Sequence, residues 1–336
     1  MLKSKNEIPI LDSLRAIAAW AVCLFHFVCT TVGFVDKDGF IYHTFHYGRY
    51  GVHLFFVISG LVIPWSLYHS NYQLKNFFKF FIKRLTRLEP PYVVSVLIML
   101  GVLFFRKYSP AYNDTEVTIT VRQILLHFGY LIPFFKGLTW INNIYWTLAI
   151  EFQYYLIIGL LYFLFISRKN YLRLAGYLIV FLLPIVLPFS NFLPYWLPLF
   201  GIGIIIFLYK INRIKIIELV AFSILFLTNI FILNDKAAFI VVLLSELAIL
   251  LLFNWSNKIL TWLGKFSYSV YLMHAIIGAA VVNLLSHYVT TMLGKFVVVI
   301  TGLIITFCVS YLMYLIVEKP SKKLSSKLAY RKNNAQ

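Results

Sequence analysis

The stretch DSLRAIAAWAVCLFHF, residues 12–27, decides how this chain folds. It is apolar and predicts a membrane-spanning helix, yet it contains Asp12, Arg15 and His26. A charged side chain near the middle of a bilayer costs about 2.5–3.5 kcal/mol on insertion scales, so three ionisable groups in one span need a reason. Arg15 and His26 are about three helical turns apart and therefore point the same way. Asp12 lies one turn before Arg15 and can pair with it.

Composition places the whole chain among membrane proteins. Of its 336 residues, 61% are hydrophobic and 12% are charged, whereas soluble domains are about 45–50% apolar and about 25% charged. We therefore expect an all-α integral membrane protein that crosses the bilayer many times. The three cysteines, Cys23, Cys29 and Cys308, lack the spacing of metal ligands, and the sequence implies no metal.

Apolar windows long enough to cross about 30 Å of hydrocarbon predict about ten transmembrane helices. They fall near residues 10–32, 51–69, 89–106, 143–166, 172–188, 193–209, 216–233, 237–253, 266–286 and 296–317. The segment 117–135 is only moderately apolar, and it predicts an interfacial or re-entrant helix. Residues 1–320 would form the transmembrane domain, and residues 321–336 a short basic cytoplasmic tail that is too short to fold alone.

The charge pattern predicts the orientation. The net charge is +18, which in a soluble protein would favour nucleic-acid binding. Here the basic residues are spread between spans, so we expect no nucleic-acid partner. Most of the 30 Lys and Arg residues lie in segments on the same side as the N-terminus, and the positive-inside rule puts both termini in the cytoplasm. The expected location is the inner (plasma) membrane, as a multi-pass protein.

Five stretches at the ends of predicted spans carry polar residues in a recognisable order. They are GVHLFFVISG (51–60), RLTRLEPPY (84–92), WTLAIEF (146–152), LGKFSYSVYLMH (263–274) and EKP (318–320). With the Arg–His pair of the first span, this set resembles membrane acyltransferase family 3, the ten-span O-acyltransferases of cell-surface glycans. The resemblance covers nearly the whole chain. One departure is His53, which stands where relatives commonly have an acidic residue.

The resemblance implies a donor and an acceptor. The donor would be acetyl-CoA or another acyl-CoA, a co-substrate reached from the cytoplasm, and no bound cofactor is implied. The acceptor would be a sugar hydroxyl on or across the membrane. Arg15 and His26 match the family's first-span pair, and the family's RxxR stretch, implicated in handling the donor, falls on Arg84 and Arg87.

The residues themselves support a catalytic role for His26. Acyl transfer from a thioester to a hydroxyl needs a base and stabilisation of a developing oxyanion. Imidazole titrates near neutral pH, so His26 is the best base in the chain, with a structural histidine as the alternative. Arg15 is too far away to touch it. Arg15 would order the cytoplasmic half of the cavity with Asp12 as counter-ion, contact the donor, or form a structural ion pair.

Other site residues are indicated by their chemistry. Arginine forks match phosphate oxygens, so Arg84 and Arg87 would bind coenzyme A, with topological anchoring as the alternative. Glu151 lies in an apolar span and would orient His26, bind the acceptor hydroxyl or pair structurally. We assign four further residues to substrate binding: Asp12, Trp146, Tyr271 and His274. His274 is also a second candidate acid or base, or a structural hydrogen-bonding residue.

The sequence thus predicts an O-acyltransferase that moves an acyl group, most simply acetyl, to a surface polysaccharide, lipopolysaccharide O-antigen or lipid-linked glycan precursor. His26, Arg15 and Glu151 form its predicted catalytic set. A rival class is a transporter or flippase of a lipid-linked or anionic substrate, with the same three residues as a proton or substrate path. An acyltransferase acting on a small molecule or a peptide amine is a third possibility.

Overall fold

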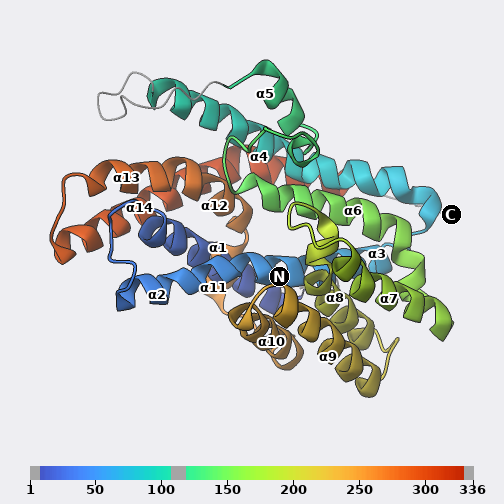
Figure 1. Ribbon diagram of the computed structural model, residues 1–336. Helices are drawn as coiled ribbons and strands as arrows, with labels where there is room; N and C mark the ends of the chain where they lie inside the picture. The colour runs from blue at the N-terminus through green and yellow to red at the C-terminus, as the bar shows by residue number, and fades with distance from the viewer. Residues whose placement is uncertain (1–7, 107–118, 329–336) are drawn as a thin grey trace.

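The computed structural model describes residues 8–106 and 119–328, and the regular elements among them are all helices (Figure 1). The α-helices are α1 (Pro9–Cys29), α2 (Phe40–His46), α3 (Gly51–His69), α4 (Phe77–Arg106), α5 (Val121–His127), α6 (Tyr145–Ile166), α7 (Asn170–Val186), α8 (Leu193–Lys210), α9 (Ile216–Leu233), α10 (Lys236–Leu251), α11 (Lys258–Gly264), α12 (Ser267–Met273), α13 (Ala279–Ser286), α14 (Met292–Met313) and α15 (Lys319–Lys327). Short 3₁₀ turns, η1 (Tyr47–Tyr50), η2 (Leu74–Asn76) and η4 (Ile132–Phe134), connect some of them.

The prediction of an all-α membrane protein is confirmed. Eight helical segments in the described part of the chain are long and apolar enough to cross a bilayer. Each of the ten predicted windows coincides with a helix, but two of these helices are shorter, namely α7 with 17 residues and α10 with 16. The count of ten and the side on which the termini lie stay predictions. The described part of 117–135 holds α5, which has seven residues and is too short to span.

Three helices differ from the predicted windows. The helix α4 is 30 residues long and begins at Phe77, so the RxxR stretch lies inside a continuous helix. The ninth and tenth windows each contain a π-helical turn, His274–Gly278 and Tyr314–Glu318. After the second turn the chain continues as α15. Residues 321–327 of the predicted tail 321–336 are therefore helical, while residues 329–336 lie outside the described part.

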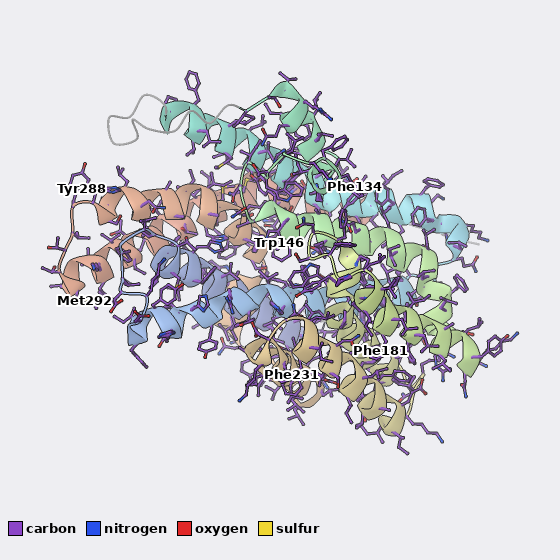
Figure 2. The ribbon with its side chains drawn as sticks, in the orientation of Figure 1. Phe134, Trp146, Phe181, Phe231, Tyr288 and Met292 are labelled. Carbon is purple, nitrogen blue, oxygen red and sulfur yellow. The ribbon has the colours of Figure 1, made fainter. Side chains whose placement is uncertain are left out.

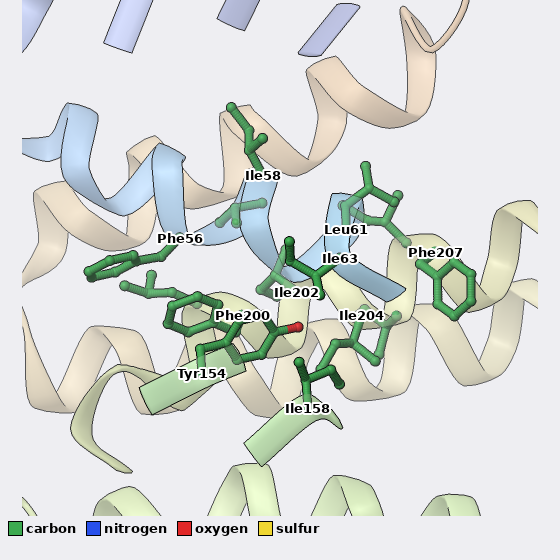
Figure 3. Close-up of a cluster of buried hydrophobic side chains, with 14 of the residues drawn as sticks. Phe56, Ile58, Leu61, Ile63, Tyr154, Ile158, Phe200, Ile202, Ile204 and Phe207 are labelled. Atoms are coloured by element: carbon green, nitrogen blue, oxygen red, sulfur yellow. The ribbon is translucent and has the colours of Figure 1, made fainter. Parts of the chain in front are cut away.

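The core lies where α3 crosses α8 and α6 (Figure 3). Figure 3 shows large apolar side chains from α3, α6 and α8 packed together, among them Phe56, Tyr154 and Phe200. Glycine permits the crossing, because a Cβ on Gly60 would lie 2.2 Å from the carbonyl oxygen of Phe200, and one on Gly203 would lie 2.2 Å from that of Val57. Gly60 of the GVHLFFVISG stretch therefore serves close helix packing.

Many large apolar side chains face outward (Figure 2). Phe134, Phe231, Tyr288 and Met292 each expose more than half of their surface, and Figure 2 shows Tyr288 and Met292 at the outer edge of the molecule. In water such a surface would favour aggregation, whereas in a bilayer it contacts lipid tails. The exposed side chains therefore agree with a multi-pass membrane protein.

Outside the core, two buried ionisable groups are fully engaged by the protein itself. Arg173 at the start of α7 lies 3.3 Å from each carboxylate oxygen of Glu218 on α9 and also donates to Asn170. His127 at the end of α5 is buried; its Nδ1 lies 2.7 Å from the carbonyl oxygen of Gln123, and its Nε2 accepts a hydrogen bond from the Ile141 amide. Both side chains join neighbouring segments of the chain.

Candidate active site

One cavity of about 630 Å³ lies among α1, α3, α4, α6, α12 and α15. Six of the residues that the sequence assigned to the site line it: Asp12, Arg15, Arg84, Arg87, Glu151 and Tyr271. Its volume is in the range of pockets that hold small molecules and cofactors. The fold therefore brings together residues from four separate stretches of the sequence.

Cationic side chains outnumber acidic ones along the wall. The six cationic residues are Arg15, Lys83, Arg84, Arg87, Lys265 and Lys322, and the three acidic ones are Asp12, Glu151 and Glu318. Arg84 and Arg87 are three residues apart on α4 and so share a face of that helix. The Arg84 guanidinium carbon lies 5.5 Å from the ring centre of Phe80 and 5.7 Å from that of Tyr155. The guanidinium therefore lies near two aromatic rings at the cavity wall.

Asp12 and Arg15 form one side of the cavity. The Arg15 Nη1 atom lies 2.9 Å from Asp12 Oδ1, which confirms the predicted pair. The helix α11 fixes this turn of α1, because a Cβ on Gly264 would lie 1.9 Å from the Asp12 carbonyl oxygen. The glycine of the LGKFSYS stretch therefore serves close packing against the first helix.

The segment after the last span also contributes to the cavity. Glu318 is fully buried, accepts hydrogen bonds from the amide and hydroxyl of Ser269, and pairs with Lys322 at 2.5 Å. Ser325 on α15 donates to the carbonyl oxygen of Lys83 on α4. The EKP stretch thus ties α12 and α15 to the cationic end of the cavity.

Glu151 lies in the cavity wall between α3 and α6. Its Oε1 atom accepts hydrogen bonds from the hydroxyls of Ser59, at 3.1 Å, and of Tyr155. These described bonds join Glu151 to the middle of the cavity rather than to His26. Of the three roles considered from the sequence, structural pairing is seen with Ser59 and Tyr155, and binding of the acceptor hydroxyl stays a prediction.

Thr147 and Tyr271 border the cavity on the side of His274 and His26, and we call this side the closed end. The hydroxyl oxygens of Thr147 and Tyr271 are 2.6 Å apart, and the Tyr271 hydroxyl also donates to the Ile144 carbonyl oxygen at 3.3 Å. The ring of Phe55 packs edge-on against Tyr271. With Val52 these side chains make an apolar end, at the starts of α3 and α6 and away from the arginines.

His26 lies beyond this closed end and does not line the cavity. The ring of His274 contacts Tyr271 on one side and His26 on the other, with ring centres 5.6 Å and 4.9 Å apart. His26 Nδ1 is 3.3 Å from His274 Nε2 and 2.9 Å from the carbonyl oxygen of Val22. One layer of side chains therefore separates His26, which is partly exposed, from the cavity.

Two residues singled out in the sequence lie elsewhere. Trp146, predicted to contact substrate, packs its ring against Trp196 and Phe56 and does not line the cavity. His53, at the position where relatives commonly have an acidic residue, is buried between the rings of Tyr50 and Trp196. Neither residue contacts the cavity.

Sequence reasoning missed Lys322, Thr147 and the contact of His274 with His26. The spacing of Glu318 and Lys322, four residues apart, was a signal that α15 continues the last helix. Thr147 carried no signal of its own within an apolar span. The two histidines are 248 residues apart, and no local pattern in the sequence predicts their contact.

Comparisons with known proteins show the family of this chain. A family model described as an acyltransferase domain matches residues 8–315. The chain is 26% identical over 296 residues to a protein of Acidianus two-tailed virus with the provisional name acetyltransferase ORF330, and the match covers 80% of this chain and 83% of the viral protein. No solved structure matches the chain.

Two bacterial relatives match shorter parts. The peptidoglycan O-acetyltransferase OatA of Listeria monocytogenes is 30% identical over 173 residues, which are 46% of this chain and 24% of OatA. The acyltransferase MdmB of Streptomyces mycarofaciens is 28% identical over 158 residues, which are 46% of this chain and 39% of MdmB. Because the family model covers most of the chain, as the five motifs indicated, the chain belongs to acyltransferase family 3.

Proposed function

We propose that the protein moves an acetyl group from acetyl-CoA to a hydroxyl of a surface polysaccharide, a lipopolysaccharide O-antigen or a lipid-linked glycan precursor, in the inner (plasma) membrane. One observation carries the proposal: one cavity is lined by six cationic and three acidic side chains and has the apolar side chains of Val52 and Phe55 at its closed end. Acyl-CoA has the matching pattern, since its phosphates are anionic and its acyl group is apolar.

The donor would lie along this pattern. Arg84 and Arg87 would bind phosphate oxygens, for which arginine forks give charge-assisted bonds. The acyl group would then point toward Val52, Phe55 and Tyr271 at the closed end. Glu151, held by Ser59, would lie beside the middle of the donor.

The acceptor would approach His26 from the other side of the Tyr271–His274 layer. In the reaction the hydroxyl gives its proton to His26, its oxygen bonds to the acyl carbon, and the carbon–sulfur bond breaks. Coenzyme A leaves as a thiolate and takes up the proton. Contact between hydroxyl and thioester requires that Tyr271 moves aside, because its ring closes the cavity.

A glycan acceptor is supported by the name of one relative. OatA is named for O-acetylation of peptidoglycan, and it matches 46% of this chain. Peptidoglycan, polysaccharide and lipid-linked precursors all offer sugar hydroxyls close to a membrane. The partners we propose are thus the lipid bilayer, the glycan and acyl-CoA.

The test uses the purified protein in dodecyl maltoside and radiolabelled acetyl-CoA. The detergent itself offers sugar hydroxyls, so acetylated maltoside and free coenzyme A are the measured products. His26→Ala should lower turnover by roughly 10²- to 10⁴-fold, the range of a general base, with unchanged elution on size exclusion. The matched control is His43→Ala, because His43 is exposed on α2 and should leave turnover unchanged.

Two results would overturn the proposal. One is that acetyl-CoA neither binds nor turns over, while vesicles that contain the protein take up a labelled solute or flip a lipid-linked sugar in a His26-dependent way. That result would support the rival transporter or flippase. The other is full turnover by the His26→Ala variant, which would remove His26 as the base.

A further inference from the structure

The contact between His26 and His274 fixes the protons on both rings. In each ring Nδ1 lies close to the backbone carbonyl oxygen four residues earlier, at 2.9 Å from Val22 for His26 and at 3.1 Å from Val270 for His274. A carbonyl oxygen only accepts, so each Nδ1 carries the proton. In the neutral rings each Nε2 then has an unprotonated lone pair.

The lone pair of His274 has one partner. Its Nε2 atom lies 3.3 Å from His26 Nδ1, so the Nδ1–H group of His26 is shared between His274 and Val22. The Nε2 lone pair of His26 is not used by either contact. The Nε2 atom of His26 is therefore available as a base, while its Nδ1–H group is held by the Val22 carbonyl oxygen and His274 Nε2.

His274 itself is out of reach of a substrate. It is fully buried, does not line the cavity, and both of its ring nitrogens are engaged by Val270 and His26. It also begins the π-helical turn His274–Gly278, a type of turn that is often found at functional sites. These observations exclude His274 as a general acid in direct contact with the substrate. His274 can therefore act only through His26.

We propose that His274 is a positioning residue, which holds His26 in the tautomer and orientation that make its Nε2 the base. When His26 takes the hydroxyl proton it becomes a cation, and hydrogen bonds from a cation are roughly twice as strong as neutral ones. The His274 acceptor therefore stabilises the charged form more than the neutral one. The inference rests on the proposed function, because it needs His26 to act as the base.

Three substitutions separate this role from simple packing. In His274→Asn the side-chain amide takes the place of Nδ1 and can still donate to the Val270 carbonyl oxygen. The Asn side chain is too short to reach His26. His274→Gln reaches the position of Nε2 and restores an acceptor. His274→Phe keeps the ring and loses both nitrogens. With radiolabelled acetyl-CoA in dodecyl maltoside, we expect kcat to fall at least about tenfold in the Asn and Phe variants, part of the usual contribution of a general base.

The KM for acetyl-CoA should stay within about twofold in all three variants, because His274 does not line the donor cavity. The Gln variant should recover at least about threefold of the lost kcat relative to Asn. The matched control is His127→Phe, another fully buried histidine with an engaged Nε2, which should lower thermal stability and leave the kcat of folded protein unchanged.

Several outcomes would overturn the positioning role. They are a folded Asn or Phe variant with wild-type kcat, equal losses in the Asn and Gln variants, or a loss confined to KM. If the Phe variant does not fold, the comparison of Asn with Gln decides. Failure of the proposed function is distinguishable, because then the wild-type protein does not turn over acetyl-CoA, or His26→Ala is as active as wild type.

Discussion

Two buried arginines, one at the cavity and one in the bundle of α7–α10, show how differently the fold uses the same side chain. Arg84 and Arg173 expose only 7% and 5% of their surface. Arg173 directs its donors to Glu218, Asn170 and backbone carbonyls, so its own chain satisfies it. The guanidinium of Arg84 lies near the rings of Phe80 and Tyr155, and its side chain lines the cavity. Burial alone thus does not separate an arginine inside the helix bundle from one that lines the cavity.

The largest expected effect on stability concerns Arg173, the arginine inside the helix bundle. Glu218→Ala leaves the buried Arg173 without its counter-ion, and removal of one partner of a buried pair costs about 3 kcal/mol or more. We expect a clear drop in the midpoint of thermal unfolding, measured in detergent. The KM for acetyl-CoA of the folded fraction should not change, and a raised KM would show that α7 and α9 also shape the donor site.

The next effect concerns the cavity arginines. Arg84→Gln and Arg87→Gln would each remove one proposed charge-assisted bond to a donor phosphate. Such a bond is worth about 1.5 kcal/mol, so the KM for acetyl-CoA should rise about tenfold. Stability should change much less than in Glu218→Ala. Lys79→Gln is the control, since Lys79 is on the same helix but does not line the cavity. An unchanged KM in both arginine variants would make the pair a topological anchor.

A smaller effect is expected at the closed end. Phe55→Ala should make room for a longer acyl group, and one more buried methylene is worth about 0.8 kcal/mol, or roughly fourfold. The ratio of kcat/KM for propionyl-CoA to that for acetyl-CoA should therefore rise about fourfold. Phe181→Ala, on α7 away from the cavity, should leave the ratio unchanged. A fall of the ratio in Phe55→Ala would place the acyl group elsewhere.

The smallest effect comes from a buried ionisable group without a counter-ion. Burial lowers the pKa of His127, which lies outside the membrane-spanning helices. The folded protein therefore prefers the neutral ring, and stability is present above the ordinary pKa of about 6.5 and declines as the pH falls below it. Thermal midpoints at pH 7.5 and 5.5 should differ less in His127→Gln than in wild type. An equal difference would assign the pH effect to other groups.

Much of the fold could be predicted because hydropathy is a local property. The apolar windows coincide with helices, and the spacing of Asp12 and Arg15 predicted their ion pair. The position of the RxxR stretch at the cavity was predictable, because two arginines stand at the start of a predicted membrane-spanning helix. The site's closure was not predictable, because it depends on how α12 packs against α6 and α1. Thr147 and His274 make these contacts with partners 124 and 248 residues away.

The two π-helical turns also bear on how this protein tolerates changes in length. A π turn bonds each residue to one five positions away instead of four, so it holds one more residue than an α turn. Removal of one residue within 275–277 would convert the turn that His274 begins into regular helix and rotate only the segment on its C-terminal side. The same holds for Tyr314–Glu318, which precedes α15. These turns are therefore the places where single-residue insertions and deletions could re-aim a helix without dismantling the bundle.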